Sequence, residues 1–376
     1  MITLRELLEE MVKRDASDLH LTVGVPPVFR VDGELLHSEH EVLRPADTQG
    51  LAFSVLTEHQ KKKFEESKEL DLSFGIEQLS RFRANVFLQR GCVAMAIRQI
   101  PFAIPSFDEL GLPKVIGDLA LKPRGLVLVT GPTGSGKSTT QAAMLDVINN
   151  HRSVHVVTVE DPIEFLHQHN RSVINQREVY EDTESFAVAL KYVLREDPDV
   201  VLVGEMRDLE TMETTLRIAE TGHLALATLH TNSCDQSINR IIDSFPAHQQ
   251  TQVRTQLSFV LEGILAQQLL PRIGGGRTLA LEMLICTPAI RALIRDQKVH
   301  QIYSLIQAGT KYGMRTMNQS LLELCQGGDI TVSDALRCTS RAEELKEMLA
   351  GGGAKLKGAP ESPPLKLTKE QVAEIK

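Results

Sequence analysis

The sequence is poor in cysteine and has no long apolar run. Its five cysteines are scattered over 376 residues and form no C-x-x-C pair, which argues against a zinc module and is typical of a reducing compartment. No stretch approaches the roughly 18 consecutive apolar residues that a membrane span needs. The N-terminus reads MITLRELLEEMVKR, an amphipathic mixture of charged and apolar residues that does not resemble a signal peptide. We therefore expect a cytosolic protein.

An excess of basic charge is also missing. The chain has 41 basic and 49 acidic residues, which gives a net charge of −8 at pH 7. This balance argues against a protein that binds nucleic acid through a broad basic surface, and we expect no nucleic-acid partner. Hydrophobic residues make up 42% and charged residues 24% of the chain, as in ordinary globular proteins. The length is sufficient for two domains.

A glycine-rich loop stands between an apolar run and an amphipathic segment. Leu126–Thr130 is typical of a buried strand, and the letters GPTGSGKST follow it in the pattern G-x-x-x-x-G-K-[ST]. From Thr139 to Asn149 apolar residues recur at helical spacing. This order is the context of a phosphate-binding loop. The residues expected to line it are Gly131, Pro132, Thr133, Gly134, Ser135, Gly136, Lys137, Ser138 and Thr139.

Each residue type in this loop suits the binding of ATP and Mg²⁺. Glycines let successive backbone N–H groups turn inward around a phosphate, and the helix beginning near Lys137 adds its positive N-terminal end. The Lys137 side chain is expected to reach the β- and γ-phosphates, and the Ser138 hydroxyl to bind Mg²⁺. By chance alone the pattern would occur about once per hundred chains of this length, and the flanking elements make an accident rarer.

Acidic residues follow two further apolar runs. Glu205 comes after VVLVG, while Glu160, Asp161 and Glu164 come after VHVVTV or shortly beyond it. The carboxyl ends of parallel strands share one edge of a sheet, where ligands bind, so these carboxylates are expected near the nucleotide. An acid at this position either binds Mg²⁺, often through a water molecule, or activates the attacking water, and Glu205 suits the second role as the group that accepts a proton. For the other acids, a structural role in the turn is the alternative.

Two histidines bracket the run LALATL. His230 stands at its carboxyl end, where a neutral imidazole can donate a hydrogen bond to a γ-phosphate oxygen. A structural donor is the alternative interpretation. His223 stands at the opposite end of the same run, which argues against a shared metal site.

The first hundred residues read as a small α/β domain with an arginine-bearing strand. Residues 81–89 alternate between an apolar face and a face that carries Arg81 and Arg83. A solvated surface is one interpretation of the arginine face. The other is positive charge supplied to the phosphate site of a neighbouring subunit, to which Arg98 on the next strand would also contribute.

Four domains or segments are expected along the chain. Residues 1–100 form the N-terminal domain, and the Pro-rich stretch 101–123 is a partly helical linker. From 124 to 350 strands and helices alternate, which predicts a mainly parallel sheet with helices on both faces and C-terminal helices. Long helices are expected at Gln249–Leu270 and Pro288–Gln307. The tail 351–376 is rich in Gly, Pro and Lys and is expected to be disordered.

Several of these segments together resemble a known family. The letters GPTGSGKSTT, TVEDPIE, DPDVVLVGEMRD and TGHLALATLHTN are similar to the Walker A, Asp box, Walker B and His box of the secretion-superfamily ATPases, in particular the type IV pilus retraction ATPases. With ASDLHL, INQREV and LREDPDV, the resemblance runs to about Leu349. It implies a PAS-like N-terminal α/β domain followed by a RecA-like ATPase domain, assembled as a homohexameric ring.

The resemblance also implies which residues do the work. Lys137 and Ser138 would hold ATP and Mg²⁺, and Glu205 would be the catalytic acid, close to the metal. The residues that would complete the site are Glu160, Glu164, His230, Arg81, Arg83 and Arg98. Such a motor hydrolyses ATP to drive pilus retraction. It acts at the cytoplasmic face of the inner membrane on a pilus platform protein, without inserting into the bilayer.

Two related functions compete with this interpretation. ATPases for pilus assembly or type II secretion commonly carry a tetracysteine module and a longer N-terminal region, and the absence of both favours retraction. An accessory paralogue of the retraction motor is the other alternative. The retraction motif AIRNLIRE appears here as AIRALIRD, from Ala289 to Asp296. Its arginines, Arg291 and Arg295, fit either the packing of a docked helix or a partner contact.

Overall fold

The computed structural model describes residues 2–31, 33–77, 79–100 and 103–351. These described residues fall into two compact units. Of the described residues, the first unit comprises those up to 103 together with Glu164–Leu166, and the second comprises 104–163 and 167–351. Residues 104–123 therefore belong to the second unit instead of a separate linker. The predicted disordered tail lies outside the described residues, except for Gly351.

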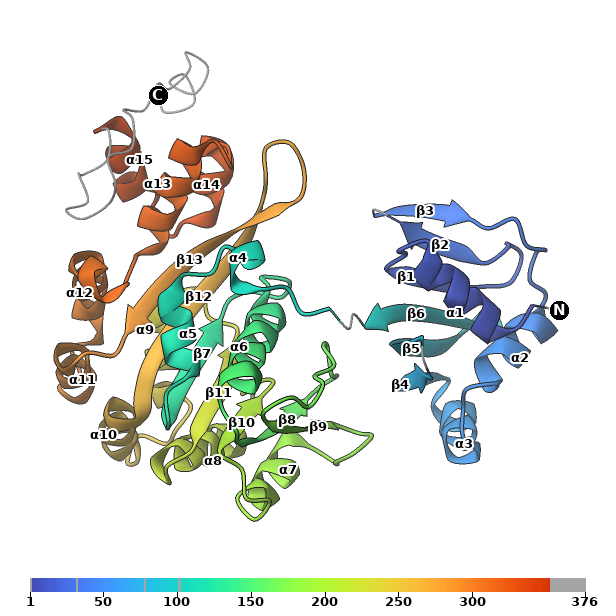
Figure 1. Cartoon of the computed structure of the whole chain (residues 1–376), viewed down its shortest axis with the longest axis horizontal. Coiled ribbons are helices and arrows are strands. Elements are labelled where there is room, and N and C mark those ends of the chain that lie inside the picture. Colours follow the sequence, from blue (N-terminus) through green and yellow to red (C-terminus); the bar gives the residue numbers. More distant parts are fainter. Residues whose placement is uncertain (1, 32, 78, 101–102, 352–376) are drawn as a thin grey trace. The chain divides into compact units, whose positions relative to one another are not determined.

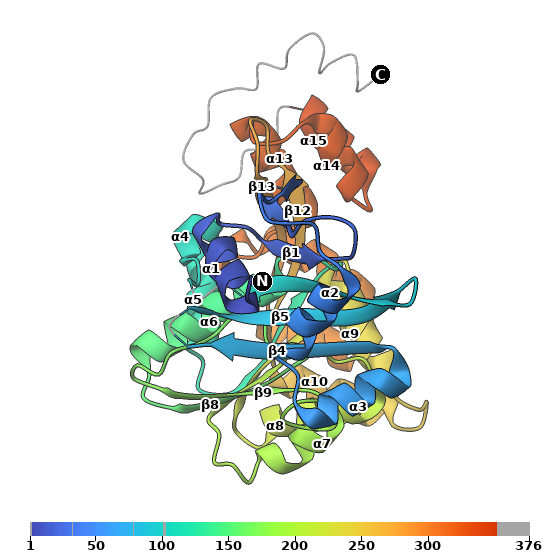
Figure 2. The ribbon, with the colours of Figure 1, turned by 90° about the vertical axis from the view of Figure 1, so that its right-hand side faces the viewer.

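The first unit is built on an antiparallel sheet with the strand order β3-β2-β1-β6-β5-β4. Its strands are β1 (Asp18–Leu21), β2 (Val28–Val31), β3 (Glu34–His37), β4 (Glu69–Ile76), β5 (Ser80–Gln89) and β6 (Cys92–Ile100). Its helices are α1 (Leu4–Lys13), α2 (Pro45–Phe53) and α3 (Glu58–Ser67). The helices cover one face of the sheet (Figure 2). Alternate strand residues, among them Leu19, Phe82 and Ile97, form the core beneath them and leave the other face polar.

The second unit contains a larger sheet with the order β13-β12-β7-β11-β10-β8-β9 (Figure 1). Its strands are β7 (Gly125–Thr130), β8 (His155–Glu160), β9 (Val173–Glu178), β10 (Val200–Val203), β11 (Leu224–Leu229), β12 (Leu261–Pro271) and β13 (Arg277–Ile285). Only β12 and β13 pair antiparallel among these described strands. The mainly parallel sheet predicted from the alternating pattern is thus confirmed.

Helices pack on both faces of this sheet. They are α4 (Phe107–Leu110), α5 (Lys114–Ala120), α6 (Lys137–His151), α7 (Phe186–Val193), α8 (Leu209–Glu220), α9 (Cys234–Asp243), α10 (Gln250–Val260), α11 (Pro288–Arg295), α12 (Ile302–Ala308), α13 (Met317–Gly327), α14 (Val332–Cys338) and α15 (Ala342–Ala350). In β7, Val127 and Val129 face the core shared with α5 and α6, whereas Leu126 and Leu128 face the core shared with α7 to α12. Because β7 is buried on both faces, it reads as a continuous apolar run.

Two predicted long helices are wrong in their extent. The first ends at Val260, and the following residues form β12, which adds to the edge of β7 and continues into a hairpin. Its apolar spacing fits a helix or a strand equally, and pairing with β7 decides between them. The second ends after Arg295, because Gln297 adopts a left-handed backbone with φ of 61° before α12 begins. None of the described helices has both the length and the apolar character needed to span a bilayer.

A buried carboxylate joins two helices of the second unit. Glu282 on β13 is 3% exposed. One of its oxygens accepts a 2.8 Å hydrogen bond from the backbone N–H of Cys234, and the other accepts one of 3.3 Å from that of Met317. These two residues open α9 and α13, so Glu282 satisfies one unpaired donor at each helix N-terminus. Burial raises the pKa of Glu282, although the two backbone hydrogen bonds oppose that change.

Replacing Glu282 with Ala should destabilise the second unit. The change leaves two buried N–H donors without an acceptor, and each such donor costs about 1–3 kcal/mol, so we expect the free energy of unfolding to fall by roughly 2–6 kcal/mol. Urea unfolding followed by circular dichroism measures this. The matched control is Glu323→Ala, which removes a partly exposed carboxylate 3.1 Å from Arg315 and should cost less than about 1 kcal/mol. Equal losses in the two variants would contradict the role of Glu282.

Candidate nucleotide site

The loop between β7 and α6 has a backbone that glycine alone fits easily. Gly131 has a φ of 144°, and a Cβ atom there would lie 2.3 Å from the carbonyl oxygen of Gln267 and 2.5 Å from the Ser135 hydroxyl. Gly134 and Gly136 also have positive φ angles, 79° and 86°, but nothing lies within 4 Å of a Cβ at Gly134. The sequence pattern therefore corresponds to a tightly folded loop that begins at one crowded glycine and ends at the N-terminus of α6.

Side-chain donors gather inside this loop. The Lys137 ammonium donates hydrogen bonds to the carbonyl oxygens of Gly131, at 2.9 Å, and Pro132, at 3.0 Å, so the side chain folds back over the loop. The buried Ser135 hydroxyl has no hydrogen-bond partner within the described residues. Ser138 stands in the first turn of α6 and is half-buried. An ammonium, a buried hydroxyl without a partner and a helix N-terminus fit an anion such as a phosphate.

The loop and the His box meet at the carboxyl edge of the sheet. β7 and β11 pair in parallel up to Thr130 and Leu229, and the Gly131 N–H donates to the Leu229 carbonyl at 3.3 Å. His230 is the next residue, so the structure brings it beside the start of the loop. The carboxyl ends of β7 and β11 therefore lie at the same edge of the sheet.

Glu205 lies just beyond the end of β10, and the side chains of Arg207 and His230 both contact one of its oxygens. The Arg207 Nε donates to Glu205 Oε1 at 2.6 Å, and His230 Nε2 lies 2.9 Å from the same oxygen. The Glu205 side chain is 17% exposed. Burial acts to raise the pKa of Glu205, but the Arg207 hydrogen bond and the charges of His230 and Arg207 outweigh it and hold this pKa below its ordinary value. Glu205 is therefore a carboxylate at neutral pH.

The backbone around Glu205 is fixed on both sides. The Gly204 N–H donates to the Val159 carbonyl at 2.8 Å, and a Cβ at Gly204 would lie 3.2 Å from the Cα of Glu160. The Met206 N–H continues the pairing by donating to the Thr228 carbonyl at 3.1 Å. The end of β10 is thus held between β8 and β11, which places Glu160 and Glu205 on adjacent strand ends.

The three acidic residues of the Asp box differ in their exposure and hydrogen bonds. Glu160 ends β8 and accepts hydrogen bonds from the Thr158 hydroxyl at 2.7 Å and the Gln176 amide at 3.2 Å. Asp161 and Glu164 are exposed in the loop that follows, and Glu164 is grouped with the first unit. Gln176 and Arg207 are two site residues whose contacts sequence patterns do not predict. Both lie inside quoted motifs, INQREV and GEMRD, and only the fold shows which carboxylate each one contacts.

The three predicted arginines all lie on the polar face of the first unit. Arg81 donates to the Ser73 hydroxyl at 2.6 Å, and Arg98 donates to Asp18 at 2.8 Å. Arg83 is exposed and stands opposite Arg98 in the register of β5 and β6. Within the described part of the first unit, Arg83 makes no hydrogen bond or ion pair. Arg83 and Arg98 are therefore the two exposed arginines of this set.

The AIRALIRD segment forms α11, and its first arginine is used inside the second unit. Arg291 donates to the carbonyl oxygens of Ser258 and Phe259, at 2.9 and 2.7 Å, and to Glu262 at 2.6 Å. It thereby satisfies carbonyl groups at the end of α10. The packing interpretation of this arginine is confirmed. Arg295 is half exposed and lies 3.8 Å from Asp296.

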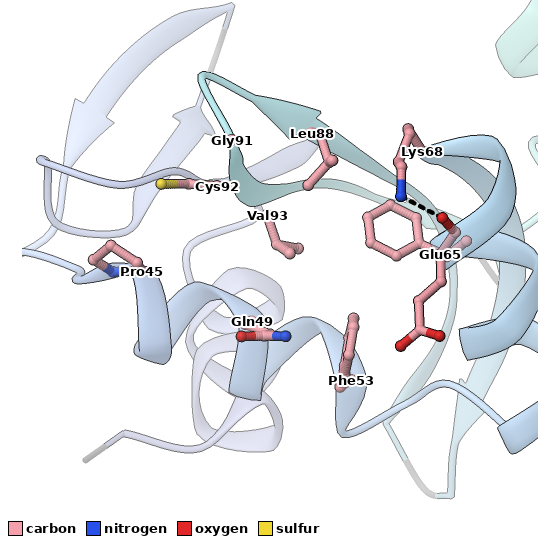
Figure 3. A pocket seen from close by; sticks show the side chains of 10 residues that line it. Pro45, Gln49, Phe53, Glu65, Lys68, Leu88, Gly91, Cys92 and Val93 are labelled. Atoms are coloured by element: carbon pink, nitrogen blue, oxygen red, sulfur yellow. Dashed lines mark hydrogen bonds between the residues drawn. The ribbon is translucent and has the colours of Figure 1, made fainter.

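The first unit also contains a small cavity of about 230 Å³ (Figure 3). It lies between α2, α3 and the β5–β6 hairpin. Its residues are Pro45, Gln49, Phe53, Phe64, Glu65, Lys68, Leu88, Gly91, Cys92 and Val93. Lys68 is engaged there, since its ammonium donates to the Glu65 carbonyl. None of the residues predicted for the nucleotide site lines this cavity.

Comparisons with known proteins agree along most of the chain. A family model described as "Type II/IV secretion system protein" matches residues 1–337. The type IV pilus retraction ATPase PilT of Pseudomonas aeruginosa is 48% identical over 332 residues, which cover 88% of this chain and 96% of the relative. The type IV pilus ATPase PilU of the same bacterium is 43% identical, with 92% and 91% covered. A crystal structure titled as the pilus retraction motor PilT with bound ADP has a TM-score of 0.88 and 53% identity, and covers 93% of this chain and 100% of that one.

Substituting Gly131 should damage nucleotide binding far more than substituting Gly134. Gly131→Ala places a Cβ 2.3 Å from a backbone carbonyl, so the loop must move and its inward N–H groups turn away. We expect the Kd of a fluorescent ATP analogue to rise by roughly tenfold or more, as happens when a preorganised phosphate cradle is lost. Gly134→Ala meets no atom within 4 Å and carries only the left-handed backbone cost of about 1–2 kcal/mol. Equal Kd values for the two variants would count against the crowded-loop geometry.

Proposed function

The chain belongs to the family of type II/IV secretion system proteins and, within it, to the type IV pilus retraction ATPases, and on that premise we propose that it is a motor that hydrolyses ATP to drive pilus retraction. One observation carries the chemical part of the proposal. The ionised carboxylate of Glu205 stands at the sheet edge beside His230, which directly follows the strand end bonded to the phosphate loop. A phosphate cradle and a base at one edge are the minimum for hydrolysis of a phosphoanhydride.

The residues divide the work in this scheme. The loop N–H groups and the Lys137 ammonium hold the β- and γ-phosphates and offset their charge. Mg²⁺, when bound, would neutralise further phosphate charge, and Ser138 and Glu205 are the residues that would hold it. Glu205 accepts a proton from the water whose oxygen attacks the γ-phosphorus. The bond between that phosphorus and the bridging oxygen breaks, and ADP leaves with the electron pair.

Three further residues have supporting roles in this scheme. His230 donates to Glu205 or, on turning, to a γ-phosphate oxygen, so it is suited to report whether the phosphate is present. Glu160 is held by Thr158 and Gln176 on the adjacent strand end and completes the acidic edge. Glu164 is the acid of this group that we assign the smallest part, because it is exposed in the following loop.

Assembly and partners follow from the family. We propose that six copies form a ring in which Arg83 and Arg98, with Arg81 beside them, close on the phosphates of a nucleotide bound by a neighbouring copy. The ring would act at the cytoplasmic face of the inner membrane on a pilus platform protein.

The accessory-paralogue alternative is tested by whether the chain, expressed alone in cells lacking both retraction ATPases, restores twitching motility. Restoration supports the main motor, and dependence on a second ATPase supports the paralogue.

Substitutions of Lys137 and Glu205 should change ATP binding and turnover in different ways. Lys137→Ala removes a ground-state phosphate contact, so ATP binding and turnover should fall together. Glu205→Gln keeps the size of the side chain but removes the proton acceptor, so binding should persist while kcat falls by roughly 10²-fold or more. The Kd of the fluorescent analogue and the steady-state release of phosphate measure the two effects. An equal loss of ATP affinity in both variants would argue that Glu205 is not the base.

Arg207 should set the acid limb of the pH profile. The Arg207 guanidinium helps to hold the pKa of Glu205 below its ordinary value, so Arg207→Gln should raise that pKa and let Glu205 become protonated at higher pH. The acid limb of kcat against pH should therefore move to higher pH, while turnover near pH 8 changes less. The control is Arg217→Gln, on an exposed position of α8. A limb that stays in place in Arg207→Gln would show that the ion pair does not govern the base.

A further inference from the structure

One row of residues crosses the polar face of the first unit. In the register of the sheet, Arg83 on β5 stands opposite Arg98 on β6, Arg98 stands opposite Asp18 on β1, and Asp18 stands opposite Arg30 on β2. Like charges that face each other across two strands are unfavourable unless an anion lies between or beside them. This row has three arginines and one carboxylate, so Asp18 cannot neutralise it alone.

Asp18 is nearly buried and uses its two oxygens separately. Its side chain is 12% exposed. Oδ1 accepts a 2.8 Å hydrogen bond from Arg98 Nε, while Oδ2 accepts one of 2.8 Å from the Ser17 hydroxyl and lies 3.8 Å from Arg30 Nε. The carboxylate is therefore fixed by its own neighbour in the chain and by the strand on each side.

The contact between Arg98 and Asp18 leaves the two terminal nitrogens of the Arg98 guanidinium available to bind a ligand. Only Nε of the guanidinium contacts Asp18, and the Arg98 side chain is 68% exposed. A guanidinium presents five donors, so one bond at Nε fixes its plane while the two terminal nitrogens can still form a bidentate pair with a phosphate. A lysine at this position could not do both, because its ammonium is a single point.

The charge of the row comes from the arginines. His20 lies two residues from Asp18 on the same face of β1, and burial lowers the pKa of His20 although Asp18 opposes this. Its imidazole is therefore uncharged at neutral pH. Arg30 is also engaged in a hydrogen bond within the first unit, since its Nη1 donates to the Gly33 carbonyl at 2.7 Å. Arg83 and Arg98 remain as the two guanidinium groups open to an anion.

We propose that Asp18 is a positioning residue that orients the Arg98 guanidinium toward the phosphates of ATP. The inference rests on the proposed function, since it requires that Arg98 contacts a nucleotide. It gives the ASDLHL segment a role, because Asp18 fixes the plane and direction of a side chain 80 residues away. A carboxylate that only ties β1 to β6 would affect stability without affecting turnover.

A double-mutant cycle on the assembled full-length protein separates these roles. The variants are Asp18→Asn, Arg98→Ala and the pair, with kcat and KM for ATP, melting temperature and oligomer mass measured for each. We expect kcat to fall by roughly tenfold in Asp18→Asn and further in Arg98→Ala, and the pair to be no slower than Arg98→Ala alone, since coupled residues are not additive. The matched control is Asp71→Asn, which alters an exposed carboxylate on the same face, 3.1 Å from the Asn85 amide. Its effect on kcat should be negligible.

A second variant keeps the test decisive if Asp18→Asn unfolds. Arg98→Lys retains an ion pair with Asp18, so the melting temperature should stay near that of the unmodified protein while kcat falls toward that of Arg98→Ala. Unchanged kcat in Asp18→Asn, with a clear loss in Arg98→Ala, would overturn the positioning role and leave the proposed function standing. Unchanged kcat in Arg98→Ala, while Glu205→Gln remains inactive, would overturn the contact of Arg98 with phosphate and the inference with it. Full activity of Arg98→Lys would also overturn the inference.

Discussion

The parallel register of β7, β11, β10 and β8 is the constraint on which the nucleotide site depends. Adjacent strands pair residue by residue up to their carboxyl ends. Gly131, His230 and Glu205 each stand one or two residues beyond such an end, and Glu160 stands at one. A slip of one residue in any strand would turn its buried side chains to the other face. The apolar packing that prevents such a slip therefore also sets the spacing of the polar groups.

The features of this site that depend on a short run of neighbouring residues could be predicted from the sequence. The phosphate loop, the acid at Glu205 and the alternating faces of β5 each follow from about ten neighbouring residues, because the local backbone alone determines them. Residues 261–270 were assigned wrongly to a helix, since their apolar spacing fits both elements and pairing with β7 decides. The contact between Asp18 and Arg98 could not be predicted from spacing. It joins residues 80 positions apart, and strand order, which brings them together, is set by packing.

The arginines show how burial separates structural from chemical roles. Arg291 makes three hydrogen bonds within the second unit, and its side chain is 24% exposed. Within the described part of the chain, Arg98 and Arg207 each contact a single carboxylate, and they are 68% and 67% exposed. A guanidinium with unused donors and access to solvent can change partners at little cost, whereas one that satisfies several backbone carbonyls cannot. Sequence patterns alone do not distinguish these cases, because the carboxylates that contact Arg291 and Arg98 lie 29 and 80 positions away in the chain.

The carboxylate of Glu282 has a mechanical consequence for the second unit. It accepts from the first N–H of α9 and from the first N–H of α13, and α9 begins four residues after His230. Both helices are thus hydrogen-bonded to the same residue of a sheet strand. A displacement of the His230 end of α9 either moves β13 and α13 with it or breaks a buried hydrogen bond. Glu282 therefore links the N-terminus of α9, close to the nucleotide edge, to the N-terminus of α13 through a single residue of β13.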